Sequence, residues 1–196
     1  MWTEPDLIEI GPNILKVNKL SNLINELDYT HEVLHRIGPL QGSLVIFNKQ
    51  YFSKIQGIDN KNYTDISLKI HELSSVFVEE IKEEYFKNYT ILKSEVSICL
   101  PKTLQGFHID PRLFHRFSKR IHIPIKTNLN AFLEIGNSRY FLNDSSIWEF
   151  NNLKLHRAGN LGSESRTHII TDFIDNYVLE TFLKKNDISK LYEIYK

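Results

Sequence analysis

The sequence predicts a mainly β protein with flanking helices, in which short antiparallel strands form a double sheet of the jelly-roll kind. Seven short strand-like segments follow one another between residues 91 and 173, separated by Asn, Asp, Gly and Ser. The first 90 residues and the last 20 show helical or mixed patterns instead. The 196 residues contain no internal repeat and no Pro-, Gly- or Ser-rich linker, which predicts one domain.

The N-terminal part is expected to alternate extended and helical pieces. Residues 6–18 predict two short extended pieces about a Gly-Pro turn, and residues 44–47 predict a buried strand. Ser21 is expected to cap a helix that stops before the Gly-Pro pair at 38–39. The clearest helix follows Asp65, because apolar residues recur there every three or four positions while glutamates take the other side. These apolar residues are Ile66, Ile70, Leu73, Phe77, Ile81 and Tyr85.

The predicted division of the domain follows from these patterns. Residues 1–90 form a helical or mixed buttress, residues 91–175 form the core that carries the active site, and residues 176–196 form a C-terminal helix or helix pair. The predicted core strands are residues 91–100, 120–126, 131–135, 139–142, 147–150, 153–157 and 166–173.

Composition excludes several classes of protein. The chain has 24 Lys+Arg against 24 Asp+Glu and a formal net charge of +0, whereas nucleic-acid binding relies on a surplus of basic residues. Neither a signal peptide nor a stretch of about 20 apolar residues is found, so no membrane partner is expected. The single cysteine, Cys99, has no partner for an internal disulfide and suits a reducing compartment, which predicts a cytoplasmic protein.

Two predicted strands place charged and aliphatic residues on opposite faces. Successive side chains of a strand alternate between faces, so Arg120 and His122 share one face while the isoleucines between and after them share the other. Arg166 and His168 share a face in the same way. One alternative is that each polar face meets solvent, and His168 also fits a structural role. Two such strands favour a polar cavity inside the fold, with helices covering the apolar side.

A candidate metal site lies beside these strands. His108 and Asp110 are separated by one residue, which brings an imidazole and a carboxylate to the same side of an extended segment. His156, on a later strand, can complete the two-histidine, one-carboxylate triad that leaves positions open on Fe(II). Arg166 follows ten residues later, and its planar guanidinium suits a carboxylate. This spacing predicts an iron site next to a site for a dicarboxylate.

In order and spacing, these motifs resemble the aspartyl/asparaginyl β-hydroxylase family of Fe(II)/2-oxoglutarate-dependent oxygenases. The resemblance covers roughly residues 94–175. The segments that carry it are Ser97-Ile98-Cys99-Leu100-Pro101-Lys102-Thr103, His108-Ile109-Asp110-Pro111, Arg120-Ile121-His122-Ile123-Pro124, Trp148-Glu149-Phe150-Asn151-Asn152, His156, and Arg166-Thr167-His168-Ile169-Ile170-Thr171-Asp172.

The resemblance implies a double-stranded β-helix core, the cupin-like form of the jelly roll. It also implies that His108 and His156 bind iron and that Arg166 pairs with the far carboxylate of 2-oxoglutarate. By the same resemblance, Arg120, His122 and Ser97 contact this co-substrate. The expected cofactors are therefore Fe(II), 2-oxoglutarate and O2.

One departure from the family pattern bears on the substrate. Animal members that hydroxylate epidermal-growth-factor-like domains have glycine at the position of Asp110, whereas small bacterial members similar to proline hydroxylases have the carboxylate. We therefore expect a complete triad of His108, Asp110 and His156. The implied function is hydroxylation of an unactivated C–H bond of an amino acid, or of an amino-acid side chain in a short peptide, with release of succinate and CO2. The alternative is a non-oxygenase cupin-like metal enzyme or binding protein that uses the same histidines.

Overall fold

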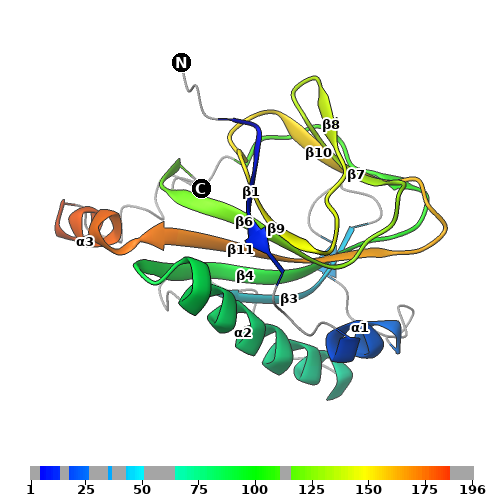
Figure 1. The fold of residues 1–196 in the computed structure, drawn as a ribbon, viewed down its shortest axis with the longest axis horizontal. Coiled ribbons are helices and arrows are strands. Elements are labelled where there is room, and N and C mark those ends of the chain that lie inside the picture. Colours follow the sequence, from blue (N-terminus) through cyan, green and yellow to red (C-terminus); the bar gives the residue numbers. More distant parts are fainter. Residues whose placement is uncertain are drawn as a thin grey trace.

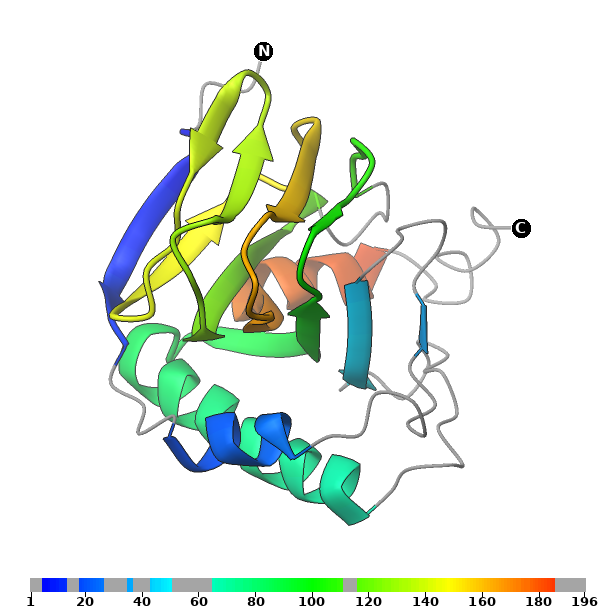
Figure 2. The same ribbon diagram turned by 90° about the vertical axis from the view of Figure 1, so that its right-hand side faces the viewer.

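The computed structural model describes residues 5–13, 18–26, 35–36, 43–50, 65–110 and 116–185. Its centre is a pair of antiparallel sheets. The larger sheet has seven strands in the order β1-β9-β6-β11-β4-β3-β2, and the smaller has four in the order β5-β10-β7-β8. Helices α1 and α2 cover one side of the larger sheet, and the smaller sheet lies on its other side (Figures 1 and 2). The mainly β, jelly-roll fold expected from the sequence is confirmed.

The elements follow the chain in a simple order. The helices are α1 (Asn18–Asn25), α2 (Asp65–Tyr85) and α3 (Asn176–Lys185). The strands are β1 (Leu7–Pro12), β2 (His35–Arg36), β3 (Ser43–Gln50), β4 (Tyr89–Cys99), β5 (Thr103–Leu104), β6 (Ser118–Lys126), β7 (Ala131–Ile135), β8 (Ser138–Tyr140), β9 (Ser146–Phe150), β10 (His156–Asn160) and β11 (Arg166–Asp175). No helix among the described residues is long and apolar enough to cross a membrane.

The main hydrophobic core lies between the helices and the larger sheet. Alternation along β6 sends Ile121, Ile123 and Ile125 into this core. Helix α2 supplies Ile70 and Phe77, among other residues, from its apolar face. The split into an aliphatic and a polar face that the sequence predicts for β6 is thus present.

The opposite face of the larger sheet is polar and nearly inaccessible to water. A second, smaller cluster of apolar residues occupies part of the space near the four-stranded sheet: Leu133, Ile135, Leu142, Phe150 and Ala158. The remaining buried side chains on this side are largely charged or polar: Ser97, Arg120, His122, His156, Asn160, Arg166, His168 and Asp172. Because buried charges need compensating partners, this polar layer marks the functional region of the fold.

Some predicted boundaries are wrong. Ser21 lies inside α1, which begins at Asn18. The first extended piece predicted within residues 6–18 is present as β1, but this strand includes the Gly-Pro pair, where a turn is expected, and has a register shift between Glu9 and Gly11. The second predicted piece falls on residues 14–17, outside the described residues. Strand β10 begins at His156 rather than at residue 153, because a hydrogen-bonded turn occupies the preceding residues. The predicted stop at residues 38–39 and the end of the C-terminal helix after residue 185 lie outside the described residues.

Candidate active site

Backbone pairing between two separate segments brings the predicted metal ligands together. His108 and His156 form an isolated antiparallel bridge, in which each amide N–H donates to the other residue's carbonyl at 2.9 and 2.8 Å. The amide of Asp110 donates to the carbonyl of Asn152 at 3.2 Å, which fixes the second end of the His-Ile-Asp segment. Possible ligand atoms of His108, Asp110 and His156 all lie within 4.8 Å of one another.

Both histidines are held in the orientation that metal binding requires. The Nδ1–H of His108 donates to the carbonyl of Gly106 at 3.0 Å, and the Nδ1–H of His156 donates to the carbonyl of Lys154 at 2.8 Å. A neutral imidazole that donates through Nδ1 has its lone pair on Nε2. Burial lowers the pKa of His156 to about 4, which keeps this ring neutral near pH 7. The Nε2 atoms and the Asp110 carboxylate therefore fit a divalent metal such as Fe(II).

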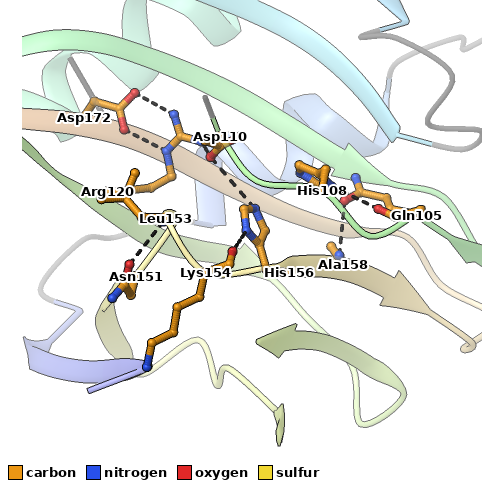
Figure 3. A network of polar contacts seen from close by, with 11 residues as sticks. Gln105, His108, Asp110, Arg120, Asn151, Leu153, Lys154, His156, Ala158 and Asp172 are labelled. Atoms are coloured by element: carbon orange, nitrogen blue, oxygen red, sulfur yellow. Dashed lines mark hydrogen bonds and ion pairs between the residues drawn. The ribbon is translucent and has the colours of Figure 1, made fainter. Parts of the chain in front are cut away.

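The turn before β10 places the carbonyl that orients His156. The side-chain oxygen of Asn151 accepts a hydrogen bond from the backbone N–H of Leu153 at 3.1 Å. The backbone N–H of Asn151 donates to the backbone carbonyl of Asp6 at 3.0 Å. The Lys154 ammonium forms an ion pair with the Asp6 carboxylate. Asp6, near the start of the chain, thus fixes the loop that carries His156, a predicted metal ligand. Figure 3 shows the contacts within this loop, from Asn151 to Leu153 and from His156 to Lys154.

Arg120 lies between two carboxylates. Its Nε and Nη2 donate to the two oxygens of Asp172 at 2.7 and 2.8 Å, and its Nη1 donates to Asp110 (Figure 3). Burial alone lowers the pKa of a guanidinium, but the nearby carboxylates outweigh it and raise the pKa of Arg120. The structure thus connects Arg120 directly to a predicted metal ligand, whereas its expected contact with a co-substrate stays a prediction.

Arg166 has a different environment. Its side chain is buried, with 4 % of the residue exposed, and it has no hydrogen-bond or ion-pair partner within the part of the chain that the structure describes. Burial lowers the pKa of Arg166, but a guanidinium keeps its charge at neutral pH. A buried cation without a carboxylate is costly for the protein alone, and it suits a bound anion.

His122 and His168 form a buried pair beside the two arginines. Their Nδ1 atoms are 3.1 Å apart, so one ring donates and the other accepts, and their Nε2 atoms are buried without a hydrogen-bond partner among the residues that the structure describes. Burial and the charge of Arg166 lower the pKa of both histidines. Ser97 is the register partner of His168 on β4. The ring of Phe150 contacts both His122 and His156, which links this polar pair to the metal cluster.

Sequence reasoning missed the partners that position these groups. The sequence motifs include Asp172 only as the end of a segment, although its spacing of four and six residues from His168 and Arg166 places it on their face of β11. Phe150 likewise lies within a sequence motif, Trp148-Glu149-Phe150-Asn151-Asn152, which did not by itself indicate its contacts with the histidines. The contact of Asp6 with Lys154 had none, because it joins residues 148 positions apart.

The fold and these residues together define a class of protein. A jelly roll that carries a His-Asp-His cluster and buried guanidinium groups between its sheets is typical of the Fe(II)/2-oxoglutarate oxygenases. A family model described as aspartyl/asparaginyl beta-hydroxylase matches residues 76–176, about half of the chain. The chain belongs to this family, and it is an oxidoreductase of the dioxygenase type. The match overlaps the segment, residues 94–175, in which the sequence motifs lie.

Solved structures agree with this fold. An oxidoreductase of the 2OG-Fe(II) oxygenase family from Burkholderia pseudomallei has a TM-score of 0.50 and 12 % identity, over 81 % of this chain and 77 % of that one. EvdMO1 has a TM-score of 0.56 and 13 % identity, over 88 % of this chain and 48 % of that one. No curated protein matches the chain.

Proposed function

We propose that His108, Asp110 and His156 bind Fe(II), and that the enzyme hydroxylates an unactivated C–H bond of an amino acid or of an amino-acid side chain in a short peptide. Succinate and CO2 are the expected co-products. The observation that carries the proposal is the approach of the three ligand groups to within 4.8 Å, with both histidines oriented by backbone carbonyls. Bound iron supplies the oxidising chemistry, with 2-oxoglutarate and O2 as co-substrates.

The residues around this cluster have roles in binding and orientation. The Arg166 guanidinium pairs with the far carboxylate of 2-oxoglutarate, because it is buried and has no carboxylate partner among the described residues. His122 and Ser97 lie on the same polar side as Arg120, and all three are expected to contact the co-substrate, as the family resemblance implies. Phe150 separates His122 from His156 and keeps water from the space between these rings.

Metal and co-substrate binding are tested first, without turnover. Protein loaded with Fe(II) and 2-oxoglutarate under anaerobic conditions should show the weak visible charge-transfer band of such a chelate. His156→Ala and Asp110→Ala should lose the band, whereas Asp144→Ala, an exposed acid on a turn, should keep it. Absence of the band in the wild-type protein contradicts the proposal.

Substrate class is tested by a succinate-release screen over free amino acids and short peptides, with mass spectrometry for a gain of one oxygen. The proposal requires succinate formation that depends on Fe(II) and on the added substrate. If zinc or manganese supports activity and Arg166→Ala leaves it intact, the chain uses the same histidines for other chemistry. That result overturns the oxygenase proposal.

A further inference from the structure

Three side chains from three parts of the chain form a continuous charged cluster. Asp172 on β11 is the direct register partner of Arg120 on β6, and Asp110 lies in the segment between β5 and β6. Arg120 donates two hydrogen bonds to Asp172 and one to Asp110. The side-chain exposures are 1 % for Asp172, 10 % for Arg120 and 16 % for Asp110, so the cluster runs from the closed interior toward the metal ligands.

The geometry of the Arg120–Asp172 pair fixes the direction in which Arg120 points. Two parallel N–H···O bonds between a planar guanidinium and a carboxylate restrict rotation of both groups. The remaining edge of the guanidinium, at Nη1, is then directed at Asp110 (Figure 3). A carboxylate accepts about four hydrogen bonds or ligand contacts, so one bond from Arg120 leaves Asp110 able to bind a metal.

Besides orienting Arg120, Asp172 affects metal binding through its negative charge. Arg120 is a buried cation in contact with a proposed ligand of a divalent metal, and like charges in a poorly hydrated region repel each other strongly. Asp172 offsets this charge without contributing a metal ligand. Without Asp172, Arg120 would repel the metal and would draw the Asp110 carboxylate to itself.

From this arrangement we propose that Asp172 is a positioning residue, which acts through Arg120 to hold the Asp110 carboxylate for metal binding. The inference rests on the proposed ligand role of Asp110. Asp172 is not one of the grouped ligand residues, so its proposed effect on the metal is indirect. Partners that orient metal ligands commonly change metal affinity by about 10- to 100-fold when they are replaced.

The test uses Co(II), whose affinity is measured by competition with a chromophoric chelator and whose visible bands report ligand geometry. Asp172→Asn preserves shape and removes the charge, and it should raise the Co(II) Kd by about 10- to 100-fold and alter the bands. Asp175→Asn is the matched control, because Asp175 lies on the same strand and accepts the amide N–H groups of Tyr177 and Val178. It should leave Co(II) affinity and spectrum unchanged.

A double-mutant cycle separates positioning from a general structural effect. In an Asp110→Ala background, Asp172→Asn should raise the Co(II) Kd by a clearly smaller factor than in the wild-type background, because the carboxylate that Arg120 holds is gone and only the charge effect of Asp172 remains. An equal loss in both backgrounds, or no loss in either, overturns the inference. If Asp172→Asn does not fold, Arg120→Lys replaces it, since lysine keeps the charge and loses the fork, and the same cycle applies. Wild-type protein that binds no Co(II), or an Asp110→Ala variant that binds it normally, overturns the proposed metal site itself.

Discussion

Replacement of Arg166 by methionine should stabilise the apoprotein and weaken co-substrate binding at the same time. Arg166 is 4 % exposed and its guanidinium is unpaired among the described residues, so folding removes a charge from water without returning a partner. Methionine keeps the unbranched stem without the charge. Replacing buried charged groups with apolar ones gains roughly 1–4 kcal/mol, and we expect Arg166→Met to raise the free energy of unfolding within this range.

The same change should cost affinity for 2-oxoglutarate. Loss of one member of a buried, hydrogen-bonded charge pair costs about 2 kcal/mol or more, which corresponds to roughly 30-fold or more in Kd. Stability is measured by urea denaturation in a chelator, and affinity by calorimetric titration of the Mn(II)-loaded protein without O2. Arg139→Met is the control, because Arg139 is half exposed and binds Glu134 away from the cluster. It should change stability by less than about 1 kcal/mol and leave affinity unchanged.

A loss of stability in Arg166→Met of more than about 1 kcal/mol, with 2-oxoglutarate affinity unchanged, refutes this reasoning. It would mean that Arg166 has a structural partner within the folded chain. A gain in the free energy of unfolding together with a loss of 2-oxoglutarate affinity is expected only if Arg166 binds a ligand and has no partner in the folded chain.

The remaining predictions concern stability. The apoprotein should lose stability between pH 7.5 and pH 5.5, by about 1.4 kcal/mol from His156, whose pKa burial lowers to about 4, and by a further amount from His122 and His168, whose pKa burial also lowers. The unfolded chain takes up these protons below its pKa of about 6.5, so the stability present above that pH is lost as the pH falls. The measurement is the urea midpoint of unfolding in the presence of a chelator. Equal midpoints at pH 7.5 and pH 5.5 would contradict the predicted loss of stability. Gly159→Ala should cost about 1–3 kcal/mol, because its Cβ would lie 2.4 Å from an aromatic carbon of β7. Phe173→Ala should cost about 3–5 kcal/mol, because this fully buried ring stacks on another phenylalanine at a centroid distance of 4.5 Å.

Two matched variants control for these stability effects. Gly106→Ala adds a methyl group where no atom lies within 4 Å, so its urea midpoint should stay close to that of the wild type. Leu129→Ala removes a side chain that is 92 % exposed and should cost less than about 0.5 kcal/mol. Midpoints for Gly159→Ala or Phe173→Ala that match these controls would contradict the packing of β10 and β11.

Local patterns predicted the regular elements of this fold well. The helix after Asp65 and the strands around Arg120 and Arg166 have long periodic sequences, and the structure contains them as α2, β6 and β11. Boundaries were less predictable where hydrogen bonds across the chain decide them. The start of β10 at His156 depends on a turn held by Asp6, and no local pattern encodes that contact.

The candidate site was predictable as a set of chemical groups and less so as a network. The His-Ile-Asp spacing and a later histidine named the three residues that the structure brings together. The pairing of Arg120 with Asp172 could not be inferred, because strand register decides which residue of β11 stands opposite Arg120. The sequence places both Arg120 and Arg166 on polar faces. Only the three-dimensional structure shows that Arg120 is paired with carboxylates and that Arg166 is not, among the described residues.

Under the proposed function, that separation accounts for the selection of a dianionic co-substrate by a chain without net charge. A molecule with zero net charge has little overall field to attract an anion, so selection depends on local groups. The charge of Arg120 is opposed by Asp110 and Asp172, whereas no carboxylate opposes Arg166 in the described part of the chain. His122 and His168 stay neutral beside Arg166, because burial and its charge lower their pKa. One buried guanidinium therefore contacts Asp110, a proposed metal ligand, and the other is proposed to receive a carboxylate from outside, which is why loss of Arg166 should affect stability and affinity in opposite directions.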